Sequence, residues 1–586
     1  MLPNDPLARV LYVDLSRRLF EIRYRPELFH RYLGGAGVAV RLLEEECPKG
    51  CDPLGPQNPI VLAVGPLTGL FPLASKTVAM FKSPHTGNLG ESHCGGRSAV
   101  AIRLAGYGAM VIKGSSETPI YLSINGEKVT FRDASSIWGL RMDSAGRVIR
   151  EREKGAGFRT IMRIGRAGEQ LVSFASVATE TYRHFGRLGL GAVFGSKKLK
   201  AVVVSGQSEV PVSDFKGYRE AYDEIYDQAV SSPVMKKYHD LGTAENVIPL
   251  QKFRGLPTKN LLASTFEHAE GISGEAFATH YLGRRLACSH CPVGCIHIAA
   301  LREPYEDEPY FYKTSMISYD YEPIYALGSM LGIGEAEGFL KLMDRVEAWG
   351  MDAMTTGVIL AWATEAQEKG LITERETLGI RFSWGDPQPY IEACRLIVHQ
   401  PNDFYRTLAH GVEEAAKKYG NLEGALSFGK NEMPGYHTGP GAHLGYLLGL
   451  RHSHLDSAGY SIDQKTLTER RVGPEELVEM LLAEEEWRQV LSSLVVCFFA
   501  RGIYSLETVE RLLRLCGYTL DKKALNALGR EICRAKYRFK VREGFEVEKE
   551  RLPGRIFSTP SPVQPFDEEF MRKGIRHWRR LIEGGE

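Results

Sequence analysis

The sequence has no long apolar run and no excess of charge of either sign. Its longest apolar runs, such as SLVVCFFA, are far shorter than the roughly 20 residues that a membrane-spanning helix needs. Its first residues, MLPNDPLARVLYVDL, lack the basic segment and apolar stretch of a secretory signal. Lys and Arg total 73 and Asp and Glu total 72, so the bulk charge favours neither nucleic acid nor an anionic membrane as a partner. We therefore expect a soluble, cytoplasmic protein with no membrane insertion and no nucleic-acid partner.

Other absences narrow the class of function. The chain has no internal repeat, no low-complexity tract and no G-x-G-x-x-G unit between a strand and a helix. A built-in NAD site is therefore not expected, and an electron acceptor must come from outside the chain. Ten cysteines in a chain without an export signal indicate reduced thiols and metal ligands rather than a disulfide framework. Such thiols suit an anaerobic or low-oxygen source.

The 586 residues exceed one ordinary core, so they predict two or three domains with room to bury a large cofactor. Up to about residue 207, strand-like segments are separated by glycines, and Asn125-Gly126 is typical of a two-residue hairpin turn. Beyond that point apolar residues recur at helical spacing. We predict an α+β protein with a β-rich domain over 1–207, a helical domain over 208–426 and a second helical domain over 427–586.

Three cysteines, Cys288, Cys291 and Cys295, form a C-x2-C-x3-C array in the segment ACSHCPVGCIH. The spacing suits zinc and an iron–sulfur cluster alike, because both take thiolate ligands from a loop. Zinc would most simply recruit His290 or His297, whereas a [4Fe–4S] cluster would need a fourth cysteine from elsewhere. The candidates for that ligand are Cys47, Cys51, Cys94, Cys394, Cys497, Cys516 and Cys533.

Further motifs accompany the array. They are GGAGVAVRLL (34–43), GPLTG (65–69), KSPHTG (82–87), CGGRSAVAIRLAGYGAMVIKG (94–114), IGRAGE (164–169), GLGAVFGSKKLKAV (189–202) and YEPIYALGSMLGI (321–333). In this order, and over nearly the whole chain, they resemble the tungsten-dependent aldehyde:ferredoxin oxidoreductases. The resemblance implies a β-rich N-terminal pterin-binding domain followed by two mostly helical domains.

The resemblance also implies the cofactors. Members of the family hold one tungsten, or in some cases molybdenum, between the dithiolenes of two pterins, next to a [4Fe–4S] cluster. By resemblance, Cys497 is the fourth cluster ligand, and Mg²⁺ is a candidate bridge between the pterin phosphates. Glycine-rich turns suit such a ligand, because they let the backbone approach closely and expose N–H groups, while Arg and Lys neutralise phosphate. The residues that match the family's pterin contacts are Lys76, His93, Gly95, Gly96, Arg97, Arg183, Gly186, Arg187, Gly189, Gly191, Glu347, Gly350, Met351, Asp352 and Val496.

The first of two family pterin motifs, D-x-x-G-L-(D/C), corresponds to EAWGMD, where Glu347 replaces the first acid. These residues also have a purely structural interpretation, which the sequence leaves open. Gly350 is a natural residue to end a helix, and Asp352 could cap the next one.

Other positions depart further from the family pattern. Lys76 stands where members commonly have arginine, and His93 where they have asparagine. In the second pterin motif, SSLVVC, Ser492 replaces the acid and Val495 the glycine. His437 replaces an aspartate in the segment GYHTGPG. The E-x-x-H pattern of the family's dimer-bridging iron site has no counterpart, so we expect no such iron.

The resemblance implies an oxidoreductase that interconverts aldehydes and carboxylic acids and passes electrons to ferredoxin or an iron–sulfur partner subunit. Glu322 and His454 match the acid and histidine beside the tungsten, one to move a proton and one to hydrogen-bond the reacting oxygen. We favour Glu322 as the base, with the roles exchangeable. A homodimer or a hetero-oligomer is expected.

Two other functions stay open at this point. One is different low-potential chemistry, such as reduction of an aromatic or enoyl thioester in a complex, for which the Tyr-rich segment 301–323 would help shape the cavity. The other is a subunit that transfers electrons through the cluster and has no catalytic metal.

Overall fold

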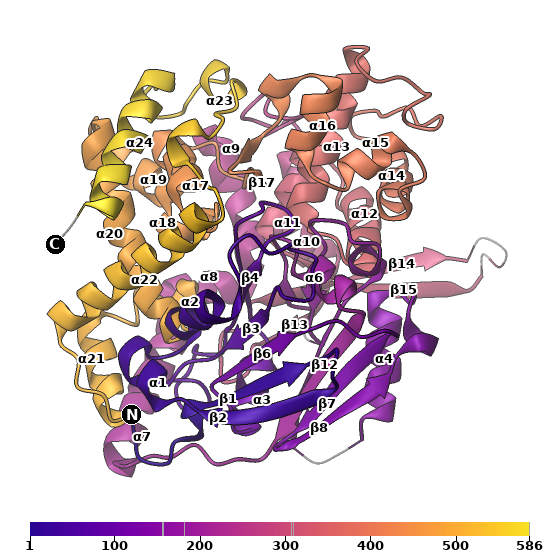
Figure 1. The fold of residues 1–586 in the computed structure, drawn as a ribbon. Helices are drawn as coiled ribbons and strands as arrows, with labels where there is room; N and C mark the ends of the chain where they lie inside the picture. The colour runs from indigo at the N-terminus through magenta and orange to yellow at the C-terminus, as the bar shows by residue number, and fades with distance from the viewer. Residues whose placement is uncertain (155–156, 181, 306–307, 309, 585–586) are drawn as a thin grey trace.

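The computed structural model describes residues 1–154, 157–180, 182–305, 308 and 310–584. Figure 1 shows the β-rich N-terminal region at the base of the view and the mostly helical remainder above it. Within the described residues, no helix is both long and apolar enough to cross a bilayer.

Two six-stranded sheets form the N-terminal region. The first has the strand order β2-β1-β6-β3-β4-β5, in which only β1 and β6 run parallel. Strands β3 and β4 are buried along their whole length, as their unbroken apolar runs require, and the edge strand β2 is mostly exposed. The strands are β1 (Arg9–Asp14), β2 (Leu19–Tyr24), β3 (Ile60–Ala63), β4 (Thr77–Lys82), β5 (Leu89–Cys94) and β6 (Ala109–Lys113).

The second sheet has the order β11-β10-β9-β12-β7-β8. The predicted β7–β8 hairpin is present, but its turn lies one residue later than predicted. Asn125 is the last residue of β7 and pairs with Lys128, and the two loop residues are Gly126, with a φ of 57°, and Glu127. The strands are β7 (Ile120–Asn125), β8 (Lys128–Asp133), β9 (Phe158–Arg163), β10 (Val177–Ala178), β11 (His184–Phe185) and β12 (Leu199–Gly206). The helices of this region are α1 (Pro26–Tyr32), α2 (Gly35–Glu46), α3 (Ser98–Leu104), α4 (Met142–Arg152), α5 (Arg166–Glu169) and α6 (Leu190–Ser196).

The middle of the chain is helical apart from two small sheets. The helices are α7 (Phe215–Ser231), α8 (Pro233–Leu241), α9 (Val247–Phe253), α10 (Gly274–His280), α11 (Tyr321–Leu327), α12 (Ala336–Trp349), α13 (Ala353–Glu368), α14 (Pro387–His399), α15 (Asp403–Leu408) and α16 (Val412–Tyr419). The strands are β13 (Leu282–Leu286), β14 (Ile296–Pro304), β15 (Tyr312–Tyr319), β16 (Ser427–Phe428) and β17 (Asn431–Glu432). The β14–β15 hairpin projects from the body at the right of Figure 1.

The C-terminal part is again helical. Its elements are α17 (Pro440–Leu448), α18 (His454–Ser457), α19 (Gly459–Glu469), α20 (Pro474–Ser493), α21 (Leu506–Leu515), α22 (Lys522–Arg542), α23 (Arg555–Ser558) and α24 (Glu568–Glu583). Together with the two N-terminal sheets, this arrangement confirms the α+β class predicted from the sequence.

Two large apolar cores cross the domain limits that the sequence suggests. One joins the N-terminal sheets to residues of α21 and α22. The other joins the middle helices to residues of α17, α20 and α24. The N-terminal region is therefore packed directly against the last third of the chain, and the candidate site lies where these parts meet.

Candidate active site and metal centre

The cysteine loop lies between β13 and β14, and the chain that follows α20 runs beside it. Leu73 joins the two segments: its N–H donates to the His290 carbonyl and its carbonyl accepts from the Cys497 N–H, both at 2.9 Å. The Ser289 N–H donates to the Gly96 carbonyl at 2.9 Å, which fixes the glycine-rich turn to the same loop. Backbone hydrogen bonds thus bring Cys497 to the array.

The thiols of Cys288, Cys291, Cys295 and Cys497 are close enough to interact electrostatically. All four are partly exposed, whereas the other six cysteines are buried. Burial raises the pKa of Cys291, and it raises the pKa of Cys295 to about 12, so metal binding must displace these protons. Among the described residues, no three His, Cys, Asp or Glu side chains already converge on one metal ion. A [4Fe–4S] cluster does not require such convergence. Each thiolate binds a different iron atom, so the four thiols must be neighbours but need not point at one metal position.

Lys76 lies between the cysteine loop and the glycine-rich turn. A Cβ added to Gly95 would stand 2.8 Å from Sγ of Cys288 and 3.3 Å from Nζ of Lys76, so only glycine fits there. The Lys76 ammonium is also within electrostatic range of the Cys497 thiol. The chain therefore places a cation between the candidate cluster and the candidate pterin cradle.

Glycine occupies the positions of the predicted cradle for different structural reasons. A Cβ at Gly189 or Gly191 would meet a backbone carbonyl oxygen at 2.0 or 2.5 Å, so tight backbone packing requires both. Gly96 has a φ of 94°, a conformation that favours glycine. Gly186 faces open space. Of this set, Gly186 is the position whose missing side chain leaves room for a ligand.

Several predicted site residues are not fully packed. Side chains packed into a core have no accessible surface, as Arg103 shows with 0% exposure. By contrast, a group of charged side chains deep in the chain retains 11 to 19% of its surface. These residues are His93, Arg183, Arg187, Glu322, Glu347 and His454. A cavity of about 390 Å³ lies beside Glu347 and is also lined by Thr179, Glu180 and Arg163.

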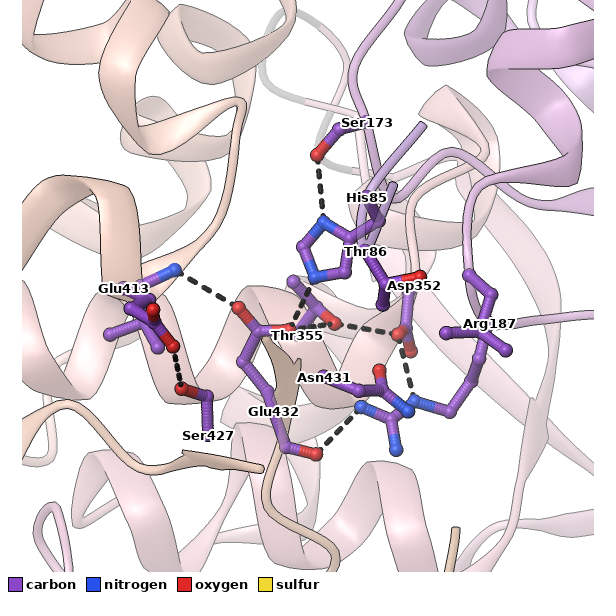
Figure 2. A network of polar contacts seen from close by, with 12 residues as sticks. His85, Thr86, Ser173, Arg187, Asp352, Thr355, Glu413, Ser427, Asn431 and Glu432 are labelled. Carbon is purple, nitrogen blue, oxygen red and sulfur yellow. Dashed lines mark hydrogen bonds and ion pairs between the residues drawn. The ribbon is translucent and has the colours of Figure 1, made fainter. Parts of the chain in front are cut away.

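Arg187 is held by a buried polar network, shown in Figure 2. Its Nε donates to Oδ2 of Asp352 at 3.1 Å, and its Nη2 donates to the carbonyl of Glu432 at 2.7 Å. The Glu432 carboxylate lies 2.9 Å from both Nε2 of His85 and Oγ1 of Thr355, and Thr355 donates on to Asp352 at 2.7 Å. Nη1 of Arg187 has no partner among the described residues. It is therefore a fixed donor available to an anionic ligand.

Two residues of the first pterin motif have the structural roles that the sequence left open, one as a helix end and one as a helix cap. Gly350 ends α12 with a φ of 80°, and the Asp352 carboxylate caps α13 by accepting from the Met354 N–H at 3.0 Å. Burial raises the pKa of Glu347 to about 8, and its side chain borders the cavity. Met351 is buried and pairs with Ala175 in an isolated bridge. The Glu347 carboxyl, which lies 3.7 Å from Nε2 of His184 and hydrogen-bonds the Ser318 backbone, is thus the group in this motif that borders the cavity.

In the second motif, the valine that stands at the glycine position adopts a backbone conformation that glycine favours. Val495 has a φ of 56°, which is strained for a β-branched residue and costs about 1–3 kcal/mol. Its carbonyl accepts from the Lys76 N–H at 3.2 Å, and Val496 and Ser492 are buried beside it. The turn into Cys497 is therefore maintained by its surroundings.

A buried charge pair holds His93. Its Nε2 lies 2.7 Å from Oε1 of Glu91, whose other oxygen is 2.6 Å from Nζ of Lys536 on α22. Burial raises the pKa of Glu91, but Lys536 and His93 outweigh it and hold that pKa well below its usual range. Burial lowers the pKa of His93 to about 4, so the imidazole is neutral and donates through Nε2. Its Nδ1 is then left as an acceptor. Arg97, by contrast, is exposed and lies over the Phe158 ring at 5.5 Å.

Arg183 and Asp320 link the cysteine loop to the helix that carries Glu322. Nη1 of Arg183 is 2.6 Å from Oδ2 of Asp320, and the guanidinium is within electrostatic range of the Cys288 and Cys295 thiols. Asp320 is the residue immediately before α11, in whose first turn Glu322 lies. One ion pair therefore connects the cysteine loop to the helix that carries Glu322.

The structure brings Glu322 and His454 together. Oε1 of Glu322 is 3.4 Å from Nε2 of His454, and its Oε2 accepts from the Gly435 N–H at 3.1 Å. The rings of Tyr436 and Tyr460 stack at 4.3 Å beside the histidine. Oε1 of Glu322 and Nδ1 of His454 make no hydrogen bond within the described part of the chain. Buried atoms of this kind are expected to have a partner, so they indicate a place for a ligand.

Burial also changes how this pair is protonated. It raises the pKa of Glu322 to about 8, although the Gly435 N–H and Arg187 act in the opposite direction. It lowers the pKa of His454 well below its usual value, and Arg187, Arg451 and Arg488 lower it further. At neutral pH the proton therefore resides mainly on the carboxyl, and the imidazole is neutral.

Two other predicted features occupy neighbouring positions. His437 is buried, with Nδ1 at 2.9 Å from Nε2 of His443, and does not touch Glu322. The Tyr-rich segment 301–323 forms most of the β14–β15 hairpin and the start of α11, and its residues 306, 307 and 309 lie outside the described residues.

The chain matches a known protein family over most of its length. The family model for the aldehyde ferredoxin oxidoreductase N-terminal domain matches residues 10–206, and the model for domains 2 and 3 matches residues 220–582. The chain is 32% identical to the tungsten-containing aldehyde ferredoxin oxidoreductases of Thermococcus kodakarensis and Pyrococcus furiosus, over 95% of this chain and 92% of each relative. It is 30% identical to an aliphatic sulfonate oxidoreductase, WOR-like subunit, of Pyrococcus furiosus, over 71% of this chain and 68% of that subunit.

Among solved structures, the chain resembles one in the active site complex BamBC of benzoyl coenzyme A reductase with 1,5-dienoyl-CoA. The TM-score is 0.79 at 20% identity, over 99% of this chain and 94% of that chain. This likeness shows a shared fold.

These matches define the chain as an oxidoreductase. It belongs to the aldehyde ferredoxin oxidoreductase family, as its motifs predicted. Sequence reasoning missed His85, Glu91, Glu432 and Lys536, which hold Arg187 and His93. The sequence offers no signal for such pairings, since His85 and Glu432 are 347 positions apart.

Proposed function

We propose that this chain interconverts aldehydes and carboxylic acids at a bis-pterin tungsten centre and passes the electrons through one [4Fe–4S] cluster to ferredoxin or a partner subunit. The observation that supports this most directly is the Glu322–His454 pair. Two titratable side chains from distant segments lie 3.4 Å apart, keep part of their accessible surface and each have a buried atom without a partner among the described residues. Most polar groups in such a place are fully satisfied, so an unsatisfied pair favours a catalytic role.

The residues that would hold the cofactors fit their chemistry. Cys288, Cys291, Cys295 and Cys497 would bind the cluster. Nη1 of Arg187 and the Lys76 ammonium would meet pterin phosphate, with Mg²⁺ as a further bridge, and Glu347 and Nδ1 of His93 would meet polar edges of the pterin rings. When bound, the tungsten would supply two-electron oxygen-atom chemistry at a carbonyl carbon, with molybdenum as the alternative metal.

The protein's own residues would then handle protons and water. The charged form of Glu322 takes a proton from water or substrate, and its protonated form returns the proton in the reverse direction. Neutral His454 donates an N–H to the reacting oxygen. The stacked rings of Tyr436 and Tyr460 cover the histidine and keep bulk water from it.

Metal and pterin analysis of anaerobically purified protein tests the proposal first. We expect tungsten or molybdenum with about two pterins per metal, as the family resemblance implies, and aldehyde-dependent reduction of a viologen dye. A folded preparation with cluster but no pterin would leave only an electron-transfer subunit. Tungsten and pterin without aldehyde turnover would redirect the search to other low-potential substrates, such as aromatic or enoyl thioesters.

A further inference from the structure

Two cysteines outside the candidate metal centre lie against each other in the N-terminal region. Cys47 is the residue at which α2 ends, and the turn that follows brings Cys51 back towards it, because the Cys51 N–H donates to the Pro48 carbonyl at 3.2 Å. The Sγ atoms of the two cysteines are 3.5 Å apart, and the residues keep only 2% and 8% of their surface. The fold therefore holds two buried thiols in contact.

One carboxylate fixes the backbone at both cysteines. Nζ of Lys82 donates to the Cys51 carbonyl at 2.8 Å. Nη2 of Arg542 donates to the Cys47 carbonyl at 3.0 Å. Both cations pair with Glu543, at 2.6 and 2.9 Å, and Glu543 directly follows α22, which packs against α2 (Figure 1). The contact between the thiols thus depends on the tertiary structure as well as on the spacing of the two residues in the sequence.

The loop between the cysteines leaves room for the small movement that a covalent bond needs. Its residues Pro48, Lys49 and Gly50 are exposed, and a Cβ added to Gly50 would meet no atom within 4 Å. The sulfurs of a disulfide are about 2.0 Å apart, so these thiols must approach by about 1.5 Å, which side-chain rotation and a slight shift of the loop can supply. A small oxidant can reach the pair from this exposed side.

Buried positive charge lies beside the pair. Nζ of Lys197 donates to the Gly114 carbonyl at 3.2 Å and is within electrostatic range of both thiols. Burial lowers the pKa of Lys197 to about 7, so near neutral pH this amine can take up a proton that a thiol loses. Burial and the neighbouring thiol raise the pKa of Cys47 to about 12, although Arg542 acts in the opposite direction. Cys47 is therefore a neutral thiol, and Cys51, the more exposed of the two, meets an oxidant first.

We propose that Cys47 and Cys51 form a reversible intrachain disulfide when the protein meets a hydroperoxide. The Cys51 thiolate attacks a peroxide oxygen, the O–O bond breaks, and a sulfenic acid and one water form. The Cys47 sulfur then bonds to the Cys51 sulfur, and the sulfenic hydroxyl leaves with the Cys47 proton as a second water. In total, two thiols lose two electrons and two protons, and hydrogen peroxide is reduced to two waters. A small dithiol reverses the bond by thiol–disulfide exchange.

This site is separate from the proposed function. Neither cysteine is among the predicted cluster ligands or pterin contacts, and the reaction needs no tungsten and no aldehyde. Disulfides in reducing compartments are commonly transient and redox-sensing, which fits a bond that forms only under oxidant. The pair would take up one two-electron oxidising equivalent per chain away from the metal centre.

Peptide mapping of the full-length, cofactor-loaded protein tests the proposal. Protein purified without oxygen is treated with hydrogen peroxide, its free thiols are alkylated in urea, and trypsin is added. Trypsin cuts after Arg41, Lys49 and Lys76, so the disulfide would join peptides 42–49 and 50–76. We expect this linked pair after peroxide, its loss with dithiothreitol, and two alkylated cysteines in untreated protein. Alkylation of both at every dose that leaves the protein folded, or bonds to other cysteines in place of this one, would overturn the proposal.

Single variants test the order of the two steps. Cys47→Ser leaves the Cys51 sulfenic acid without a thiol to resolve it, so dimedone should label Cys51. Cys51→Ser should leave Cys47 unlabelled at the same peroxide dose, since burial keeps it protonated. Equal labelling in the two variants would contradict the assigned roles. Cys516, a buried thiol whose Sγ lies 3.8 Å from the Pro66 carbonyl, serves as a control in every sample and should stay alkylated.

A further pair of variants tests whether the fold positions the thiols. Glu543→Gln weakens the ion pairs through which Lys82 and Arg542 hold the two cysteine carbonyls, and should slow formation of the linked peptides severalfold. Glu546→Gln changes an exposed acid of the same segment, which pairs with Lys549, and should leave the rate as in wild type. Circular dichroism checks that both variants are folded, and equal rates in folded proteins would refute the positioning role of Glu543. If Glu543→Gln does not fold, the cysteine variants still decide the proposal.

Discussion

Glu322→Gln gives a test in which stability and activity should move in opposite directions. Burial raises the pKa of Glu322 from 4.5 to about 8. In the unfolded chain the group ionises near its ordinary pKa, so between about pH 4.5 and pH 8 folding must either protonate it or bury its charge. When the pKa of a carboxyl is higher in the folded state than in the unfolded state, the free energy of unfolding falls as pH rises from the lower pKa to the higher one. The raised pKa of Glu322 therefore lowers the free energy of unfolding by about 3 kcal/mol at pH 7 and by less than about 1 kcal/mol at pH 5.

Glutamine keeps the acceptor for the Gly435 N–H and removes the titration. We therefore expect apo Glu322→Gln to be more stable than wild type by about 3 kcal/mol at pH 7 and by little at pH 5. Because a chain of this size need not unfold in one step, the first urea transition is the quantity to compare. Turnover should fall by roughly 10²-fold or more with tungsten and cluster content intact.

Asp463→Asn is the matched control. Burial raises the pKa of Asp463 to about 7, but its carboxylate accepts from the Gly441 and Ala442 N–H groups and the Thr438 hydroxyl. An asparagine amide would place N–H against one of these donors, so this variant should lose stability. A Glu322→Gln protein that is less stable than wild type at pH 7, or one that oxidises aldehydes at the wild-type rate, would refute the reasoning.

The same pKa sets the pH dependence of turnover. Aldehyde oxidation needs the charged carboxylate as base, so its rate should rise as pH passes through about 8, and reduction of acids should be favoured below it. The remaining predictions concern the metal centre and the network. Cys497→Ala should lose iron and acid-labile sulfide, whereas Cys516→Ala, a buried thiol in the N-terminal core, should keep both; equal iron content would contradict the ligand assignment. Gly95→Ala puts a methyl 2.8 Å from a ligand sulfur and should lower cluster occupancy, while Gly473→Ala, with open space around it, should not. His85→Ala removes the imidazole hydrogen bond to the buried Glu432 carboxylate, which keeps its bonds from the Val412 N–H and Thr355, and should cost about 1–3 kcal/mol in urea unfolding.

Local signals in the sequence were enough for the β-rich first part, its hairpin and the change to helices, but not for the β13–β15 sheet inside the segment that was predicted to be helical. The apolar run of β4 forms a buried strand, and the glycine of Asn125-Gly126 marks a hairpin whose two loop residues are Gly126 and Glu127. Likewise, Gly350 and Asp352 were predicted as a helix end and a helix cap from residue type alone, and both have those roles.

Contacts between distant segments could not be predicted from local signals in the sequence. Spacing could place three cysteines together, but Cys497 became a candidate ligand only through the family resemblance, because an isolated thiol on an apolar segment has no distinguishing pattern. The Glu91–Lys536 pair joins β5 to α22, and neither residue carries a local signal. Such pairs form because a buried charge needs a partner, and the sequence alone does not show which residues will be buried together.

The arrangement of charge explains why the site lies at the seam between parts of the chain. Lys76, Arg183 and Arg187 bring cations from three loops of the N-terminal region, while Glu322 and Glu347 lie on helices of the middle region with pKa values of about 8. Arg183 is paired with Asp320 and Arg187 with Asp352, so among the described residues Lys76 is the one of these three cations without a carboxylate partner. An anionic cofactor would supply the missing negative charge and hydrogen-bond acceptors in one step. Ligand binding to the folded state alone stabilises it, so cofactor loading and closure of the seam should be thermodynamically coupled.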